Sequence, residues 1–303
     1  MIVGSLAVLV AACSGPNGPG DRTDDGRLRV VASFYPLAEA ARRVGGPTVE
    51  VTNLTPAGSE PHDLELSSGE VDRIEDAAVV LYLGGGFQPA IEGAVDRAKG
   101  AAVDLLSADL GLLTAAEDEE DGKDKDQDWA DPHVWLDPTL QRKLAIRVQV
   151  ALANADPANA TTYQANAATY GAELEALDGE FRRGLAACDR RVIVTAHAAF
   201  GYLARRYDLT QEAIAGLAPE AEPEAGRLAE LTNKVKAEGI TTIFYETLVA
   251  PDVAETLARE AGVDTAVLDP VEGLSEEQLS NGQSYVSAMR GNLEAIRAAL
   301  GCR

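Results

Sequence analysis

Two kinds of hydrophobic pattern alternate along most of this chain. Short apolar or β-rich runs are separated by segments in which apolar residues recur every three or four positions, the spacing of a helix that buries one face. In the first half the strand-like runs are Arg29–Ala32, Val49–Leu54, Ala78–Leu83 and Ala101–Leu105. The helical segments between them are Pro36–Val44, Gly69–Glu75 and Pro89–Ala98. This alternation predicts βαβ units and a parallel sheet.

A second series with the same alternation fills the last third of the chain. Its strand-like runs are Arg191–Thr195, Thr210–Ile214, Thr241–Tyr245 and Thr265–Leu268. Its helical segments are Glu224–Glu238, Val253–Ala261 and a closing helix over roughly Ser280–Leu300. We therefore predict an α/β fold of two lobes, each with a parallel four-stranded sheet flanked by helices.

The segment between the two series predicts one long helix. A single apolar stripe runs along it at spacings of three and four: Tyr163, Ala167, Tyr170, Leu174, Leu177, Phe181 and Leu185. Asp156 followed by Pro157 is a typical helix start. A helix of about 28 residues is about 40 Å long, enough to join two lobes as a stiff backbone, although an ordinary packed helix has the same stripe. The predicted boundaries are 27–155 for the first lobe, 156–187 for the linking helix and 188–303 for the second lobe.

The start of the chain has the pattern of a bacterial lipoprotein signal. The apolar run Met1–Ala12 ends in small residues directly before Cys13, although no Lys or Arg precedes it. The run is too short to span a bilayer. We expect lipidation at Cys13, with residues 1–26 as signal and flexible tether; the alternative is an apolar N-terminus with an incidental cysteine.

Composition and charge narrow the classes of function. Hydrophobic residues make up 46% of the 303 residues, enough for two sizeable cores, and the net charge of -23 excludes a nucleic-acid-binding role. The acidic run Glu117–Asp128 has no apolar residue and predicts a solvated loop, with weak cation collection as the alternative. In a secreted chain the two remaining cysteines, Cys188 and Cys302, favour a disulfide over two buried thiols.

The only three histidines lie where a binding site is expected. His62 and His197 follow predicted strands, and His133 lies in a proline-flanked loop after the acidic run. Asp269 follows the strand Thr265–Leu268. Ligands of parallel sheets bind beyond the carboxyl ends of the strands, and these residues come from both halves of the chain. Three imidazoles and a carboxylate suit tetrahedral Zn²⁺, so the sequence indicates a zinc site between two lobes.

Three segments resemble the cluster A-I solute-binding proteins of ABC importers for zinc and manganese, especially the zinc-uptake (ZnuA-like) group. The resemblance lies in Gly58–Glu65, Asp131–Pro138 and Thr195–Tyr202, with support from Ile214–Pro223, Ile243–Glu246 and Val267–Pro270. It implies two α/β lobes joined by one long helix, with the metal in the cleft between them. It also implies that His62, His133 and His197 are ligands, with Asp269 as the fourth and Glu60 as the alternative fourth ligand. Glu246 matches a family glutamate near the cleft; we interpret it as orienting a histidine ring, with a structural ion pair as the alternative.

The resemblance also implies what the protein does. We expect a lipid-anchored monomer on the outer face of the cytoplasmic membrane that binds Zn²⁺ and delivers it to an ABC permease. Manganese-type relatives have Glu at the third position, so His197 favours zinc, and a manganese-binding homologue is the alternative. A zinc hydrolase with Glu60 or Glu246 as general base, and an adhesin, are further alternatives. Many zinc-uptake relatives have a His-rich insertion before the second ligand, whereas Glu117–Asp128 contains no histidine.

Overall fold

The fold consists of two parallel sheets with the same strand order, as the sequence predicts. The computed structural model describes residues 21–114, 130–221, 223 and 226–303, so Cys13 and the acidic run Glu117–Asp128 lie outside the described residues. The first sheet has the order β2-β1-β3-β4, with β1 Leu28–Ala32, β2 Val49–Asn53, β3 Val79–Tyr82 and β4 Ala101–Asp104. The second has the order β6-β5-β7-β8, with β5 Val192–Thr195, β6 Thr210–Ala213, β7 Thr242–Tyr245 and β8 Asp264–Val267. All neighbouring strands are parallel, which confirms the predicted fold class.

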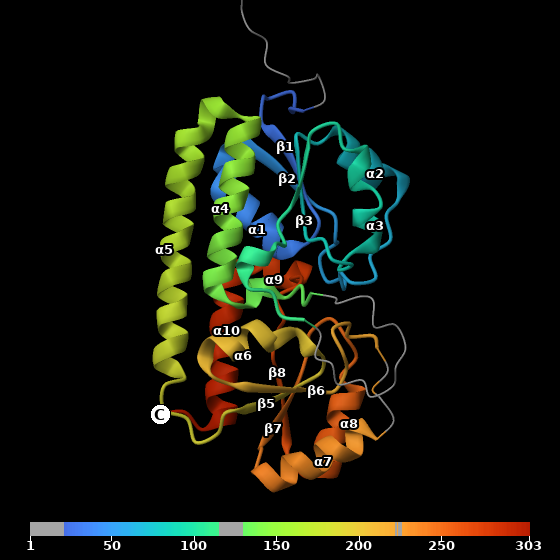
Figure 1. Cartoon of the computed structure of the whole chain (residues 1–303), viewed down its shortest axis with the longest axis vertical. Helices are drawn as coiled ribbons and strands as arrows, with labels where there is room; N and C mark the ends of the chain where they lie inside the picture. The colour runs from blue at the N-terminus through green and yellow to red at the C-terminus, as the bar shows by residue number, and fades with distance from the viewer. Residues whose placement is uncertain (1–20, 115–129, 222, 224–225) are drawn as a thin grey trace, which may run out of the picture.

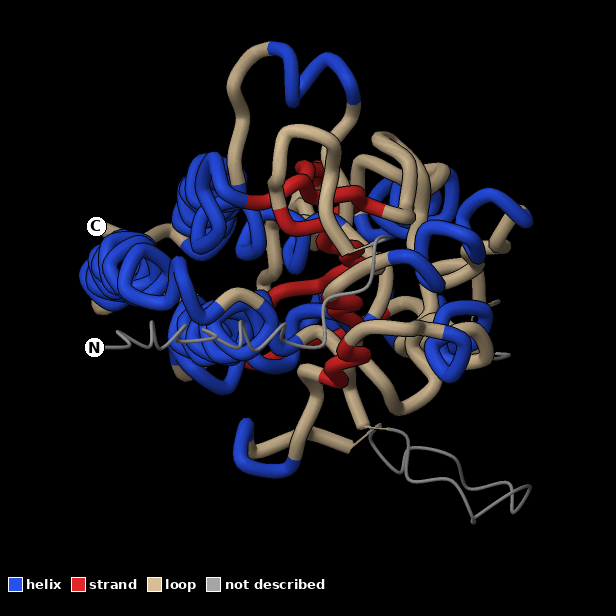
Figure 2. The backbone as a smooth tube through the Cα atoms, turned by 90° about the horizontal axis from the view of Figure 1, so that it is seen from above, coloured by secondary structure: helices blue, strands red, loops and turns tan. Residues whose placement is uncertain are grey.

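Helices flank both sheets, and the long ones gather on one side of the molecule (Figure 2). In the first lobe the helices are α1 Tyr35–Gly45, α2 Ser68–Asp76 and α3 Pro89–Glu92. Two long helices follow, α4 Pro138–Ala155 and α5 Ala160–Gly184. The remaining helices are α6 Gly201–Tyr207, α7 Arg227–Glu238, α8 Asp252–Ala261, α9 Glu276–Ser280 and α10 Tyr285–Leu300.

Two predicted helices are interrupted in the structure. The closing helix divides into α9 and α10 because Gly282 adopts φ +75°, a left-handed conformation that ends a helix, and Ser284 then caps α10. The segment Pro89–Ala98 forms only the short helix α3 and a separate 3₁₀ turn, Val95–Arg97. The predicted linking helix is present as α5, preceded by a 3₁₀ turn at Pro157–Asn159. Helix α4 has no counterpart among the predicted helices.

The long helices join the two lobes through one continuous apolar core. α5 runs beside both lobes, and α10 packs against it in the second lobe (Figure 1). One buried cluster includes Leu28 and Leu81 of the first sheet, Leu174 of α5, and Ile193 and Phe244 of the second sheet. Separating or rotating the lobes would expose part of this cluster to water, which is costly. None of the helices in the described part of the chain has the length and apolar character of a membrane span.

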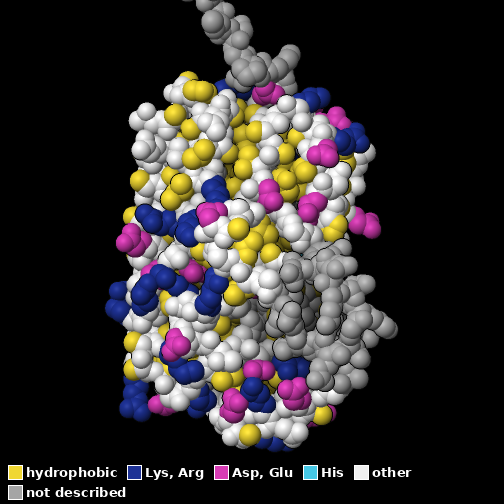
Figure 3. Space-filling model, viewed as in Figure 1, with side chains coloured by type: hydrophobic (Ala, Val, Ile, Leu, Met, Phe, Trp, Pro, Cys, Tyr) yellow, Lys and Arg dark blue, Asp and Glu magenta, His cyan; other side chains and the backbone are white. Residues whose placement is uncertain are grey.

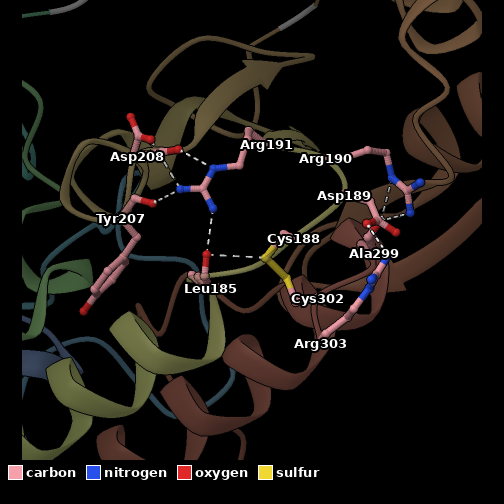
Figure 4. Close-up of a disulfide and its surroundings, with 10 residues drawn as sticks. All are labelled: Leu185, Cys188, Asp189, Arg190, Arg191, Tyr207, Asp208, Ala299, Cys302 and Arg303. Carbon is pink, nitrogen blue, oxygen red and sulfur yellow. Dashed lines mark hydrogen bonds and ion pairs between the residues drawn. A yellow bond between two sulfur atoms is a disulfide. The ribbon is translucent and has the colours of Figure 1, made fainter.

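A disulfide between Cys188 and Cys302 closes the second lobe at its far end (Figure 4). This is the pairing that the sequence favours. It joins the turn after α5 to the residues that follow α10. Beside it, Arg191 donates hydrogen bonds to the carbonyl oxygens of Leu185, Tyr207 and Asp208 at 2.7, 2.9 and 2.9 Å. The disulfide and the arginine together fix the ends of α5, α6 and α10 relative to each other.

Candidate metal centre

Four potential metal ligands meet between the two lobes. They are His62 after β2, His133 before α4, His197 after β5 and Glu272 after β8, so three of them follow the carboxyl ends of strands. The side chains of His133 and His197 are 0% exposed and that of Glu272 is 1% exposed, whereas that of His62 is 10% exposed. No histidine side chain is visible on the part of the surface in Figure 3 that the grey atoms leave uncovered.

The ligand atoms have the spacing of a tetrahedral metal site. Oε1 of Glu272 lies 3.4, 3.2 and 3.6 Å from the Nε2 atoms of His62, His133 and His197, in that order. The Nε2 atoms of His133 and His197 are 3.3 Å apart. Bonds of about 2.0–2.2 Å to a tetrahedral zinc place neighbouring ligand atoms about 3.3–3.6 Å apart. These four distances match those around one zinc ion, and all four ligand atoms lie within 4.8 Å of one another.

Carboxylates fix the orientation of two of the three imidazoles. Oδ1 of Asp131 lies 2.7 Å from Nδ1 of His133 and also accepts the backbone N–H of His133 at 2.9 Å. Oε1 of Glu246 lies 2.6 Å from Nδ1 of His197 and accepts its backbone N–H at 3.2 Å. A carboxylate on Nδ1 directs Nε2 toward the metal and makes it a stronger ligand. Glu246 thus lies where the predicted orienting role requires. Asp131 is not among the predicted site residues, although the Asp-Pro-His spacing is typical of an aspartate that binds the backbone two residues on.

Asp269 lies next to the cluster but not in it. Its Oδ1 accepts the backbone N–H of Val271 at 2.7 Å, and its own backbone N–H and C=O bind the side-chain amide of Asn292. Val271 adopts φ +56°, a rare conformation for a β-branched residue. The resulting turn directs Glu272 to the place that we expected Asp269 to occupy. Asp269 instead stabilises this turn, and Glu272 is not among the residues predicted from the sequence.

Glu60 forms the outer edge of the site. Its Oε2 accepts the backbone N–H of His62 at 2.9 Å, while its Oε1 lies 3.8 Å from Nε2 of His62 and has no hydrogen-bond partner among the described residues. Burial and the nearby charge of Glu272 raise the pKa of Glu60 to about 7. A carboxylate in this position is close enough to reach a metal after a small movement, as expected for the alternative ligand.

The surrounding carboxylates shift the pKa values of two histidines upward. Burial alone would lower the pKa of His197, but hydrogen bonds to Glu246 and Glu272 and their charges outweigh it and raise the pKa to about 10. The pKa of His133 is also raised, because Asp131 and Glu272 outweigh the effect of burial. For His62 burial dominates, and its pKa is lowered. The two most buried histidines of the metal-free site therefore bind protons more tightly than His62 does.

Hydrogen bonds join the chain segments that carry the potential metal ligands. The indole N–H of Trp135, two residues after His133, donates to the carbonyl oxygen of Pro270 at 2.7 Å, and the hydroxyl of Tyr285 donates to the carbonyl oxygen of Trp135. The backbone N–H of Gly58 donates to the carbonyl oxygen of Leu274 at 3.1 Å. The segments that carry His62 and His133 are thus both hydrogen-bonded to the segment that carries Glu272, without any metal.

Known proteins with this sequence pattern are zinc-uptake components. The family model "Zinc-uptake complex component A periplasmic" (ZnuA) matches residues 30–299. The zinc-binding lipoprotein AdcA of Streptococcus pneumoniae serotype 4 is 38% identical over 304 residues, which cover 98% of this chain and 60% of AdcA. The high-affinity zinc uptake system protein ZnuA of Bacillus subtilis is 33% identical over 99% of this chain and 96% of its own length. The chain thus spans about three fifths of the length of AdcA and nearly all of ZnuA.

Solved structures agree with the sequence comparison. The Zn(II)-bound ZnuA-like domain of Streptococcus pneumoniae AdcA superimposes with a TM-score of 0.75 at 37% identity, covering 91% of this chain and 99% of that domain. The metal-dependent lipoprotein YcdH of Bacillus subtilis gives a TM-score of 0.75 at 32% identity, covering 90% of this chain and all of YcdH (100%). The two-lobed fold, the histidine motifs and the family match together show that this chain belongs to the ZnuA family of zinc-uptake solute-binding proteins.

Proposed function

We propose that this protein binds Zn²⁺ outside the cytoplasmic membrane and delivers it to the permease of an ABC importer. The observation that carries the proposal is the cluster of three imidazoles and one carboxylate at tetrahedral spacing, buried between two lobes. The names of the relatives, zinc-binding lipoprotein and zinc uptake system protein, support zinc as the cargo.

We assign the four ligands to His62, His133, His197 and Glu272, with Glu272 in place of the expected Asp269. One carboxylate reduces the buried charge of a zinc complex from +2 to +1, which lowers the cost of burial. Asp131 and Glu246 orient two of the rings, and Glu60 is the nearest further carboxylate. Three nitrogens and one oxygen favour zinc over manganese, which prefers oxygen ligands.

The same geometry argues against a zinc hydrolase. A catalytic zinc site keeps one coordination position open for water. Here four protein ligands fill the tetrahedron, and three of them are 0–1% exposed, so little room is left for a water nucleophile. Binding and release of the ion are the activities that such a site supports.

Release by movement of ligand loops fits this molecule better than lobe rotation. The apolar core that includes α5 extends into both sheets, and rotation would disrupt it. The His62 segment, in contrast, lies at the outer edge of the site and includes the most exposed ligand. Withdrawal of one ligand is sufficient to weaken zinc binding strongly.

The remaining parts of the proposal concern location and partners. Residues 1–26 are the proposed signal and tether, with Cys13 as the lipidated residue; Cys13 lies outside the described residues. The lobes at 27–155 and 188–303 and the linking helix at 156–187 are the proposed divisions of the rest. We propose a monomer held at the outer face of the membrane, where it meets its permease.

Metal competition tests the proposed function. We expect the metal-free protein to bind Zn²⁺ with a sub-micromolar dissociation constant at pH 7, and Mn²⁺ at least about 100-fold more weakly, because three imidazoles suit zinc. Titration against a zinc-sensitive chelator, with and without Mn²⁺, measures both constants. Equal affinity for the two ions, or no zinc binding, would contradict the proposal.

Zinc binding should also release protons. At pH 7.5 the metal-free His197 is protonated, because its pKa is raised to about 10, and the raised pKa of His133 acts in the same direction. A proton and Zn²⁺ compete for the same Nε2, so affinity falls as pH falls, by about tenfold per pH unit for each proton released. Calorimetry in buffers of different ionisation enthalpy should give at least about one proton per zinc at pH 7.5. Glu246→Gln should lower this number, and a wild-type value of zero would contradict the raised histidine pKa values.

A further inference from the structure

His62 is the ligand that the site holds most weakly by its side chain. Its Nε2 faces Glu272 at 3.4 Å, but no hydrogen-bond partner for its Nδ1 lies among the described residues. The other two histidines each have a carboxylate on Nδ1, at 2.7 and 2.6 Å. The Phe87 ring meets the His62 imidazole edge to face, with ring centroids 4.8 Å apart, but such a contact does not fix the ring in one orientation. The position of His62 therefore depends mainly on its backbone.

Two side chains hold that backbone: Glu60 accepts the N–H of His62, and Gln88 binds the residue before it. The Gln88 side chain is buried beneath the His62 segment, and its Nε2 donates to the carbonyl oxygen of Pro61 at 3.2 Å, the residue directly before His62. The same Nε2 donates to Oγ1 of Thr55 at 3.3 Å, and Thr55 in turn donates to the carbonyl oxygen of Ser33 at 2.8 Å. A chain of hydrogen bonds thus runs from the end of β1 through Thr55 and Gln88 to the residue before His62.

The other end of the Gln88 amide, its Oε1, indicates that the side chain is needed for the hydrogen bond to the Pro61 carbonyl. Oε1 of Gln88 is buried and has no hydrogen-bond partner among the described residues. A buried polar atom without a partner is destabilising, so an apolar side chain of similar size would avoid that cost. It would, however, remove the Gln88 donor from the Pro61 carbonyl and leave it with the longer bond from the backbone N–H of Leu64, at 3.4 Å.

We propose that Gln88 is a positioning residue of the metal site, which sets zinc affinity by holding the Pro61 carbonyl and thereby His62. The inference rests on the proposed function, because it concerns the same zinc ion. Phe87 and Gln88 act on the His62 segment together: the phenylalanine limits the ring from the side and the glutamine anchors the backbone from below. Loss of the anchor lets His62 leave the metal more often, so zinc dissociates faster.

The test compares two buried glutamines. Gln141 of α4 matches Gln88 in burial, in a hydrogen bond from Nε2 to a proline carbonyl (Pro36, 3.1 Å) and in an Oε1 without a partner among the described residues. Gln88→Met and Gln141→Met each remove the bond to a proline carbonyl with little change in volume, and Gln88→Met also removes the bond to Thr55. We expect Gln88→Met to raise the zinc dissociation constant and dissociation rate by about tenfold, the usual effect of losing a residue that supports a ligand. Gln141→Met should lower the melting temperature of the metal-free protein comparably and leave zinc dissociation within about twofold.

A double-mutant cycle identifies the route of the effect. Because Gln88 acts through His62, Gln88→Met should weaken zinc binding much less in a His62→Ala background than in the wild type. Gln88→Asn retains the amide on a shorter side chain and should give the same faster dissociation; it replaces the methionine variant if that one does not fold. Equal zinc kinetics in the Gln88 and Gln141 variants, or an undiminished effect in the His62→Ala background, would overturn the inference. Absence of zinc binding in the wild type would instead overturn the proposed function.

Discussion

His197→Ala should raise the dissociation constant for zinc by about 10²–10³-fold. Zinc binding to structural sites has a free energy of about 10–16 kcal/mol, so one of four ligands contributes about 2.5–4 kcal/mol. His197 is 0% exposed and is held by Glu246, and no other histidine is available to replace it. A water molecule taking its place would be a poorer ligand without the support of that carboxylate. Competition with a chelator of known zinc affinity measures the change.

The control for this variant is Glu246→Gln. It keeps a hydrogen-bond acceptor beside Nδ1 of His197 and removes only the negative charge, so zinc affinity should fall by about tenfold. His197→Ala also leaves Glu246 buried without its main partner, which lowers stability, so the melting temperature of both metal-free variants should be recorded. Wild-type zinc affinity in a folded His197→Ala variant would exclude His197 from the site.

The strands and the three histidines could be predicted because each leaves a local signal. Buried parallel strands such as β3 and β5 are short continuous apolar runs between helical segments. Parallel strands place the residues after them at one edge of their sheet, which puts His62 and His197 each at the carboxyl edge of its own sheet; the family resemblance then implies that they share one site. The second-lobe strand order repeats that of the first, and the ligands of both lobes meet in one cluster.

Helix α4 is hard to recognise in the sequence because apolar residues lie on its exposed face as well as on its buried face. Leu144 and Val148 are buried, but Ile146 and Val150 on the same helix are 45% and 49% exposed. A surface helix is recognised by apolar residues spaced three or four apart on one face, and apolar residues on the opposite face weaken that pattern. A local start signal is nevertheless present, because Asp137 caps α4 and Pro138 is its first residue, and α4 packs against α1 and α5.

Glu272 could not be predicted for a different reason. Strand β8 and the family motif both point to Asp269, the first carboxylate after the strand. The chain continues through Val271 with φ +56°, and a valine gives no sign of a left-handed conformation in a sequence. That turn, together with its hydrogen bond from the backbone of Val271 to Asp269, exchanges the roles of the two carboxylates.

Glu272→Gln should therefore weaken zinc binding far more than Asp269→Asn. The glutamine has the shape of Glu272 but no charge, so a bound zinc ion would keep its full +2 charge in a buried site. We expect zinc affinity to fall by at least about 100-fold, since a neutral amide oxygen is also a weaker zinc ligand than a carboxylate oxygen. Asp269→Asn keeps an oxygen that can accept the backbone N–H of Val271, so the turn should persist and zinc affinity should change by no more than about threefold.

The pair of variants distinguishes the two assignments of the fourth ligand. Glu272 contacts all three histidines, whereas the oxygen of Asp269 is engaged by the turn. Removing the charge of Glu272 should also lower the histidine pKa values, so Glu272→Gln should release fewer protons on binding zinc than Asp269→Asn. A large loss of affinity in Asp269→Asn with a small one in Glu272→Gln would make Asp269 the ligand. The reverse order, with reduced proton release in Glu272→Gln alone, would establish Glu272 as the carboxylate that completes the zinc site.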